Sequence, residues 1–306
     1  MIERPIEASW LALRYRADAR AREHSLPLVQ AAAAHLRGTS LDTGDTHQEP
    51  ACDVIVVDVG AGTGANLRWL GPQLDGALGS ARRQDWRLLD HDAVLLDAVK
   101  GSQPAWLRRS TRHTGAVDTL ATLLDRAHAP TLVTCSALLD LLTPSQIDEL
   151  VAATVAGADA ALWSLSVTGE VELTPSHPDD ALVTELFNSD QQRGTEPSAG
   201  VETLAGPDGW RLAVEAFSAR GWSVTTADTP WVLGAGDEPL VARLLTERAA
   251  AARSTNPDAS DHHVIDSWLT RRLEHLARGA LTVRIDHVDV LALPVKSISE
   301  QTSSPN

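Results

Sequence analysis

The chain has 306 residues, and 43% of them are hydrophobic, which suffices for one large domain or for one domain with an appended cap. Its 26 Lys and Arg residues stand against 41 Asp and Glu residues, so the formal net charge is −15. Such a charge repels a phosphate backbone, and basic pairs such as Arg82-Arg83 and Arg108-Arg109 are typical of solvated faces. We therefore expect no nucleic-acid partner.

No apolar run approaches the roughly 20 residues that cross a bilayer, and the N-terminal residues do not resemble a signal peptide. We expect a cytoplasmic protein without a membrane partner. Cys52 and Cys135 lie in or beside apolar runs, as free cysteines of a core do, so no disulfide framework is predicted. His262 and His263 are adjacent and point apart on a helix, so we expect no metal site.

The first predicted elements are helices. Residues 7–37 are rich in Ala, Leu and Arg, with apolar residues at helical spacing and a break at Pro27. A polar loop follows at 38–50. We take residues 1–50 as an N-terminal helical cap and loop, 51–295 as the main domain and the Ser-rich residues 296–306 as a disordered tail.

A glycine-rich turn is the most informative segment of the chain. The apolar run 54–57 predicts a strand buried on both faces, and Gly60, Gly62 and Gly64 follow directly. Glycine lets a backbone turn sharply and approach a ligand closely, and the next helix points unpaired N–H groups at that ligand. The segment predicts a nucleotide-binding socket.

Two cofactors compete for this socket. Gly60-x-Gly62-x-x-Ala65 satisfies the dinucleotide fingerprint with Ala in the last place, which favours NAD or NADP. However, Asp58-Val-Gly60-x-Gly62-x-Gly64 resembles the first motif of class I S-adenosylmethionine-dependent methyltransferases. An acid at this position suits a cationic or amine-bearing ligand and opposes a pyrophosphate. The resemblance therefore implies S-adenosylmethionine as the cofactor.

The resemblance extends along the chain. Residues 86–90 resemble the family's second strand, whose final carboxylate, here Asp90, grips the ribose hydroxyls. Asp90 follows Gly64 by 26 residues, which predicts an extra loop at 71–83. Asp118 is similar in position to the family's acid near the adenine amine, and Ser136 ends a fourth strand facing the cofactor. The implied cofactor contacts are Asp58, Gly60, Ala61, Gly62, Gly64, Asn66, Asp90, His91, Asp118 and Ser136.

Later strands complete the predicted fold. Residues 129–136 and 160–167 read as parallel strands, and the late pair 221–226 and 281–293 resembles the antiparallel edge of the methyltransferase fold. The expected class is α/β: a doubly wound, mostly parallel, seven-stranded Rossmann-like methyltransferase sheet with N-terminal helices. A helical insertion at about 237–279 precedes the last strand, and 51–295 is the methyltransferase domain.

The expected function is in-line transfer of a methyl group from S-adenosylmethionine to a small-molecule acceptor. The Asn/Asp-Pro-Pro-Tyr/Phe and Pro-Cys motifs of nucleic-acid base methyltransferases are missing, and so are nucleophile-elbow, P-loop and H-E-x-x-H motifs. Two alternatives stay open: a non-catalytic cofactor-binding or assembly subunit, and an NAD(P)-dependent oxidoreductase. The acceptor, the acceptor atom and a homo-oligomeric state are not fixed by the sequence.

The acceptor is expected beyond the carboxyl ends of the parallel strands. The stretch 168–193 leaves the fifth strand and is dense in polar groups, which predicts an acceptor wall. His177 is the candidate general base, because its ordinary pKa lies near neutrality, although a surface histidine in a turn fits the same pattern. Arg193 is a candidate for holding an anionic acceptor, and the helices that carry Trp10 and Arg14 are candidates for a lid.

Overall fold

The computed structural model describes residues 6–39, 53–79, 82–101, 103–124, 129–193, 202–255 and 259–295, with the backbone alone for 259–261. Its strands are β1 (Val54–Val59), β2 (Gln84–Asp90), β3 (Leu107–Thr114), β4 (Thr131–Ser136), β5 (Ala160–Thr174), β6 (Trp222–Asp228), β7 (Trp231–Leu233) and β8 (Thr282–Pro294). Its helices are α1 (Ala8–Arg22), α2 (Leu26–Gly38), α3 (Ala65–Leu78), α4 (Ala93–Asp97), α5 (Leu120–Leu123), α6 (Pro144–Gly157), α7 (Asp180–Gln191), α8 (Gly209–Ala219), α9 (Glu238–Thr255) and α10 (Ala259–Ala277).

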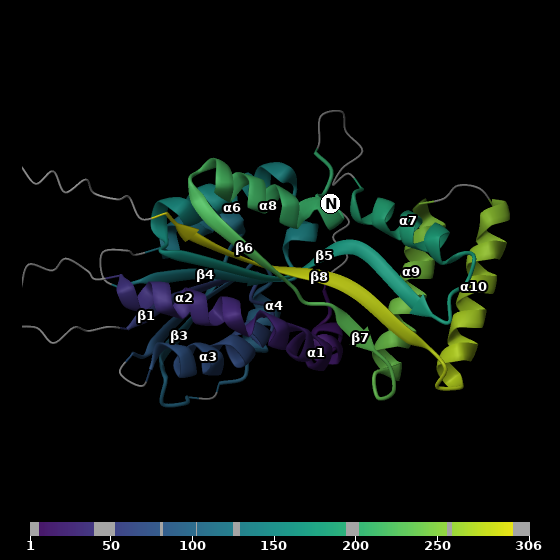
Figure 1. Cartoon of the computed structure of the whole chain (residues 1–306), viewed down its shortest axis with the longest axis horizontal. Coiled ribbons are helices and arrows are strands. Elements are labelled where there is room, and N and C mark those ends of the chain that lie inside the picture. The colour runs from purple at the N-terminus through teal and green to yellow at the C-terminus, as the bar shows by residue number, and fades with distance from the viewer. Residues whose placement is uncertain are drawn as a thin grey trace, which may run out of the picture.

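One sheet runs through the molecule in the order β3-β2-β1-β4-β5-β8-β6, and β7 pairs with β8 (Figure 1). β1 to β5 are parallel, whereas β8 is antiparallel to β5, β6 and β7. The doubly wound, mostly parallel sheet is therefore confirmed. The described residues form eight strands rather than seven, because the far half of β8 also pairs with the three residues of β7.

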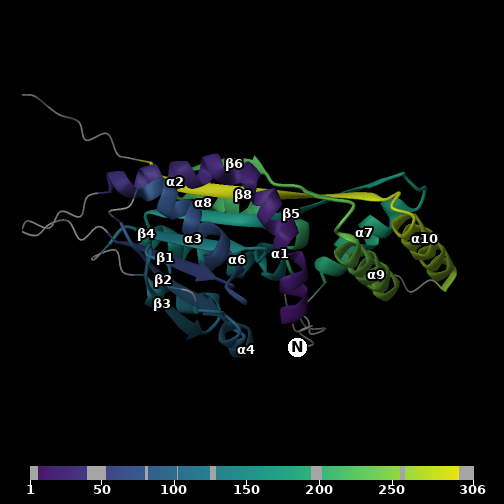
Figure 2. The same cartoon turned by 90° about the horizontal axis from the view of Figure 1, so that it is seen from below.

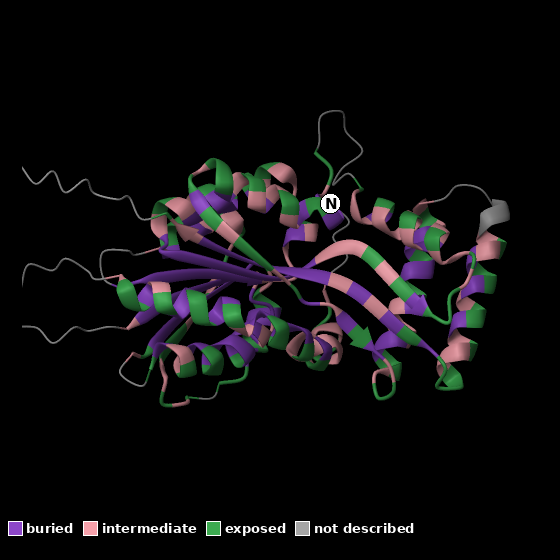
Figure 3. Ribbon diagram, viewed as in Figure 1, coloured by how far each residue is buried: buried purple, intermediate pink, exposed green. Residues whose placement is uncertain are grey.

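Helices cover both faces of the sheet, as Figure 3 shows by the buried strands between half-exposed helices. Along β1, Val54 and Val56 pack with the apolar faces of α2 and α3. Ile55, Val57 and Val59 point the other way and pack with α6 and α8. This alternation explains why the strand is a continuous apolar run: each face of a doubly covered parallel sheet needs its own apolar residues.

β5 and β8 continue beyond the parallel strands as a long antiparallel ribbon (Figures 1 and 2). α7, α9 and α10 lie at the far end of this ribbon, where they form a third apolar cluster with it. α9 and α10 lie within the insertion expected at 237–279. The loop expected at 38–50 and the tail expected at 296–306 lie outside the described residues, apart from Gly38 and Thr39.

Two local expectations are wrong. The break between the first helices is a 3₁₀ turn at Glu23–Ser25, and Pro27 stands inside the first turn of α2, where its missing N–H has no partner to lose. Residues 71–78 are helix, not loop: α3 continues through Pro72 to Leu78 because Leu74 and Leu78 are buried against the sheet. In the part of the chain that the structure describes, no helix is long and apolar enough to cross a membrane.

Candidate functional site

The glycine turn joins β1 to α3 at the carboxyl edge of the parallel strands. Gly60, Gly62 and Gly64 have φ angles of +69°, +52° and +75°, which L side chains rarely adopt. Gly64 caps the N-terminus of α3, and the N–H of Ala61 donates to the carbonyl of Leu89 at the end of β2. The turn is thus a tight strand-to-helix connection, and side chains of other elements, Leu138, Leu11 and Val99, lie 3.0 Å from the Cβ positions that the glycines leave empty.

Asp58 lies at the end of β1 and is 1% exposed. Its Oδ1 accepts a hydrogen bond from Asn66 Nδ2 (2.8 Å), which also donates to Thr134 Oγ1 (3.0 Å). Its Oδ2 has no hydrogen-bond partner among the described residues. Burial raises the pKa of the Asp58 carboxyl to about 7, against the lowering effects of the Asn66 hydrogen bond and of the positive charge of Arg22. One oxygen of this buried carboxylate is therefore held by Asn66, and the other, Oδ2, has no donor among the described residues.

Asp90 ends the adjacent strand β2 and is also buried. Its Oδ2 accepts from the backbone N–H of Gly62 (2.7 Å), and its Oδ1 accepts from the N–H of Asp92 (2.9 Å). The carboxylate is held against the glycine turn, with lone pairs left for a diol. Asp92 caps α4 by accepting from Val94 and Leu95, while the exposed side chain of His91 reaches Asp90 Oδ1 at 3.4 Å.

Helix α1 covers this turn. An ideal Cβ on Gly62 stands 3.0 Å from Leu11 Cδ1, so α1 packs directly over the turn. Arg22, at the end of α1, is 3% exposed, lies over the Trp69 ring at 4.0 Å and donates from Nη2 to Ser164 Oγ at 3.4 Å. Its Nε has no partner among the described residues. Burial lowers the pKa of this guanidinium, against the charges of Asp289, Asp18 and Asp58.

The chain after β4 forms the next part of the site. Ser136 ends β4 half-buried, and Ala137 has a positive φ of +52°. Asp140 follows in the 3₁₀ turn Leu139–Leu141 and accepts a hydrogen bond from Gln191 Nε2 of α7 (3.4 Å). Burial raises the pKa of the Asp140 carboxyl, while the positive charge of Arg14 on α1 acts in the opposite direction. Asp140 is therefore a titratable group close to both α1 and α7.

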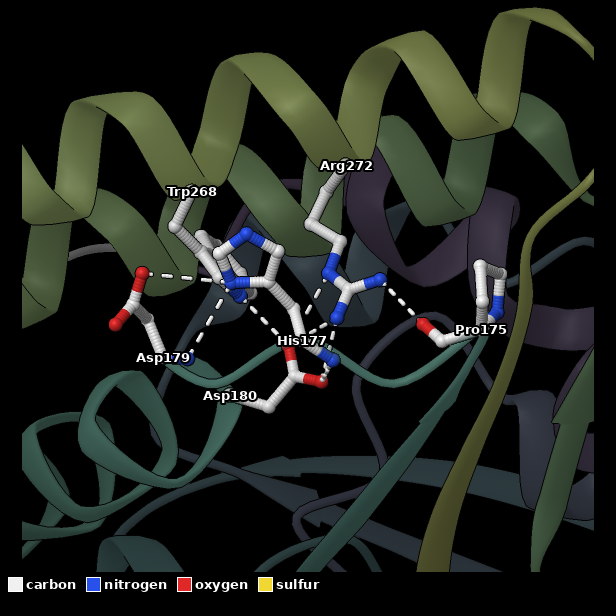
Figure 4. Close-up of polar contacts among 6 residues, drawn as sticks. All are labelled: Pro175, His177, Asp179, Asp180, Trp268 and Arg272. Atoms are coloured by element: carbon white, nitrogen blue, oxygen red, sulfur yellow. Dashed lines mark hydrogen bonds and ion pairs between the residues drawn. The ribbon is translucent and has the colours of Figure 1, made fainter.

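Asp118 and His177 make no contact, among the described residues, with Asp58, Asp90 or Asp140. Asp118 is exposed in a 3₁₀ turn after β3, where its carboxylate accepts from the adjacent Thr119 (3.3 Å). His177 follows the far end of β5, beside α10 (Figure 4). Since a strand rises about 3.3 Å per residue, the ten residues from Ser164 to Thr174 place His177 on the order of 30 Å from the glycine turn.

A buried structural cluster surrounds His177 instead (Figure 4). The backbone N–H of His177 donates to Asp180 Oδ2 (2.7 Å). Asp180 also accepts from Arg272, which is fully buried, and from Trp268 Nε1 (2.8 Å). Arg193 pairs with Asp190 at 2.9 Å, three residues earlier on the chain. The ring of His177 accepts from the backbone N–H of Asp179 at Nδ1 (3.3 Å). The structure thus gives both His177 and Arg193 partners near them in the chain.

Sequence reasoning missed Arg22 and did not single out Asp140 as a site residue. The amino-acid sequence does not indicate that Arg22 is buried, because an Arg in an Ala-rich helix is usually solvated. Only the packing of α1 against the sheet buries this one. Asp140 carried a weak signal, its position just after a strand that ends in the socket. Within the described ranges, no group of three or more His, Cys, Asp or Glu side chains is arranged to hold a metal ion.

Comparison of the sequence with protein-family models and with curated proteins gives no match. Among solved structures, loganic acid methyltransferase with SAH is similar over 97% of this chain and 99% of that chain, with 11% identity and a TM-score of 0.45. A cyclopropane-fatty-acyl-phospholipid synthase-like protein from Lactobacillus casei is similar over 92% and 99%, with 14% identity and a TM-score of 0.44. A putative type II methyltransferase from Anaeromyxobacter dehalogenans is similar over 87% and 97%, with 13% identity and a TM-score of 0.43. Likeness at these values carries no information on activity, which has to be inferred from this chain's own residues.

Proposed function

We propose that the chain binds S-adenosylmethionine at the glycine turn and transfers its methyl group to a small molecule. The observation that carries the proposal is a pair of buried, oppositely charged groups beside the turn, each with an atom that lacks a partner: Asp58 Oδ2 and Arg22 Nε. The amino-acid part of the cofactor carries an ammonium and a carboxylate, and its ribose carries a diol. Asp58, Arg22 and Asp90 match these three groups in charge and hydrogen-bonding capacity.

A nicotinamide dinucleotide fits these residues less well. A pyrophosphate at the turn would be repelled by Asp58, and two carboxylates already face the turn from β1 and β2. The sheet also departs from the all-parallel order 3-2-1-4-5-6 of dinucleotide-binding domains, because antiparallel β8 stands between β5 and β6. Both observations support the sulfonium cofactor over NAD or NADP.

The chain's residues have defined tasks on this proposal. The cofactor supplies an activated methyl group, which an acceptor displaces in line. Asp58 and Arg22 fix the amino-acid end, Asp90 fixes the ribose, and α1 excludes water by covering the turn. Alignment of this kind contributes roughly 7–11 kcal/mol to a displacement in favourable cases. Asp140 replaces His177 as the candidate base, because it follows β4 and not the far ribbon. Residues 51–295 form the methyltransferase domain and 1–50 its cap.

Calorimetry on the whole chain tests the proposal. S-adenosylhomocysteine is expected to bind with micromolar-range affinity, and NAD and NADP are not. Asp90→Ala is expected to weaken binding by roughly 1.5–3 kcal/mol without unfolding the protein, since it removes charged hydrogen bonds. Asp97→Ala, at the exposed end of α4, is the matched control. Saturable NAD binding without a response to S-adenosylhomocysteine would overturn the assignment.

One alternative deserves its own measurement. A non-catalytic subunit would bind the cofactor and never consume it. Turnover of S-adenosylmethionine to S-adenosylhomocysteine in the presence of a metabolite extract separates the two functions. We expect turnover that depends on the extract and that needs a higher cofactor concentration in Asp90→Ala.

A further inference from the structure

The two edge strands of the sheet, β3 and β6, differ in charge. β3 carries Arg108, Arg109 and Arg112, and charged side chains of this kind protect an edge strand from pairing with other chains. β6 runs along the opposite edge (Figure 1), and no residue from 221 to 227 is charged. Three residues in the middle of β6 are β-branched, as strand pairing favours. β6 is therefore an edge strand without the protection that β3 has.

Half of the backbone groups of β6 face away from the sheet. The N–H of Thr229, just after the strand, donates to the carbonyl of His287 on β8 (2.8 Å). Because hydrogen-bonded pairs alternate along two antiparallel strands, the odd-numbered residues of β6 face β8 and the even-numbered residues face the free edge. Within the described part of the chain, no other strand pairs with this edge. β6 thus presents a row of unpaired donors and acceptors roughly 20 Å long.

Helices cover both faces of the sheet beside β6 without covering the edge itself. Trp222 and Val224 pack with the apolar cluster of α8 on one face, and Ala227 packs with the cluster of α2 and α3 on the other. Thr225 and Thr226 point to opposite faces, and both are exposed. A strand from another molecule can therefore reach the edge from either side of the sheet.

We propose that β6 pairs antiparallel with β6 of a second copy of this chain, about a twofold axis at Val224. Outward backbone groups must meet outward groups, so even-numbered residues face even-numbered residues in such a pair. Val224 then faces Val224 of the second copy, and Ser223 faces Thr225, whose hydroxyl can hydrogen-bond across the pair. The segment is thus complementary to itself, as a twofold interface requires.

The charges at the two ends of β6 favour this pairing. Arg220 precedes the strand, where it holds Asp148 of α6 at 2.8 Å with its side chain 29% exposed, and the exposed Asp228 ends the strand. A twofold axis at Val224 places Arg220 of each copy near Asp228 of the other, whereas a shift by two residues sets Asp228 against Trp222. The net charge of −15 opposes association at long range, but the Debye length at physiological salt is only about 8 Å.

Sedimentation velocity on the whole chain without cofactor tests the proposal, which does not rest on the proposed function. At physiological salt we expect the sedimentation coefficient to rise from that of a monomer to that of a dimer between about 1 and 100 µM protein. A monomer at every concentration overturns the proposal. A species larger than a dimer also overturns it, because a twofold pair of edge strands closes the assembly.

Reversal of the end charges tests the register. Arg220→Glu and Asp228→Arg each set like charges together at both ends of the pair, so each variant alone is expected to dimerise about tenfold more weakly than the parent. An equimolar mixture of the two variants restores an opposite-charge pair at both ends and is expected to dimerise like the parent. Single variants that dimerise like the parent, or a mixture as weak as they are, overturn the proposed pairing.

Removal of one outward N–H tests the strand itself. Thr226→Pro deletes an N–H that faces the free edge and leaves the ladder with β8 intact, so it is expected to weaken the dimer about tenfold or more without unfolding the chain. Ser110→Lys, on the exposed edge strand β3, is the control and should leave the dimer unchanged. Full dimerisation of Thr226→Pro places the interface elsewhere and overturns the proposal; if that variant does not fold, the mixing experiment decides.

Discussion

Asp58 links the candidate cofactor site to the stability of the fold. Because burial raises the pKa of this carboxyl from 3.8 to about 7, the native state holds a proton that the unfolded chain releases at lower pH. The stability that this proton contributes is present below pH 3.8 and is lost as the pH rises to about 7. Asp58→Asn abolishes the titration and keeps an oxygen that can accept from Asn66.

We therefore expect Asp58→Asn to be more stable than the parent, without cofactor, by an amount that grows with pH. The gain should be on the order of 2–3 kcal/mol larger at pH 8 than at pH 5. Urea unfolding at the two pH values measures it, with Asp97→Asn at the exposed end of α4 as the control. A gain independent of pH would mean that Asp58 is ionised throughout this range in the native protein.

Substitution of Asp140 should lower turnover without changing the affinity for the cofactor. A partly buried carboxyl with a raised pKa, at the carboxyl end of β4, is suited to take a proton from an acceptor. Asp140→Asn is expected to lower turnover by roughly 10²–10⁴-fold and to leave the affinity for S-adenosylhomocysteine within twofold. Steady-state kinetics with an acceptor found by metabolite screening provides the test. Full turnover in the variant would mean that the reaction needs no base at this position.

Single residues also show where sequence reasoning ends. Asp58 could be predicted because it stands at the end of a continuous apolar strand, and Asp90 because the segment that it ends resembles the second strand of the methyltransferase family. Arg22 and Arg248 could not. Both stand in helices whose composition is typical of a solvated face, and only packing between distant elements buries them.

At the scale of elements, helix α1 and the glycine turn form one unit. Gly62→Ala brings two costs: backbone strain at φ +52° and contact of the new Cβ with Leu11 Cδ1 at 3.0 Å. The contact is with the far end of a flexible side chain, which can move, whereas the strain of roughly 1–2 kcal/mol cannot be relieved. Strain should therefore dominate.

A double-mutant cycle with Leu11→Ala checks this expectation by urea unfolding. We expect Gly62→Ala to lose about 1–2 kcal/mol in either background, with a coupling below about 0.5 kcal/mol. Substantial rescue by Leu11→Ala would instead show that α1 is pressed onto the turn. In that case Gly62→Ala would test closure of α1 and not the turn itself.

The sequence predicted least well the elements whose conformation depends on packing or pairing with a distant segment of the chain. The second half of β5 alternates polar and apolar residues from Val167 to Thr174, and its polar groups suggested a loop. Their backbone groups are paired because β8 pairs with Val167 and, after an irregularity, with 171–174. Similarly, α3 needs a glycine at position 71, because an ideal Cβ there would stand 2.2 Å from the Trp106 ring. No local sequence pattern reveals this contact.

At the scale of the whole molecule, two regions share the ribbon of β5 and β8. The parallel core with the glycine turn stands at one end, and the helices α7, α9 and α10 stand at the other (Figure 2). The parallel core could be predicted, because short apolar strands alternate with helices there. The far region could not, because its helices find their buried face only on a ribbon formed by strands more than a hundred residues apart.

Substitutions in the Asp180 cluster test whether the region of α7, α9 and α10 affects cofactor binding at the glycine turn. Arg272 is fully buried, and its Nη2 lies 2.5 Å from Asp180, whose carboxylate also accepts from Trp268 Nε1 and from the backbone N–H of His177. Arg272→Met leaves the Asp180 charge buried with fewer donors, so it should cost about 3–5 kcal/mol. Arg271→Met, one residue away and exposed, should cost less than about 0.5 kcal/mol. Urea unfolding measures both, and calorimetry with S-adenosylhomocysteine on the native variants is expected to agree with the parent within twofold. Loss of S-adenosylhomocysteine binding in folded Arg272→Met would show instead that the β5–β8 ribbon couples the far region to the glycine turn. His177 would then influence the cofactor site indirectly, without contact with the reacting groups.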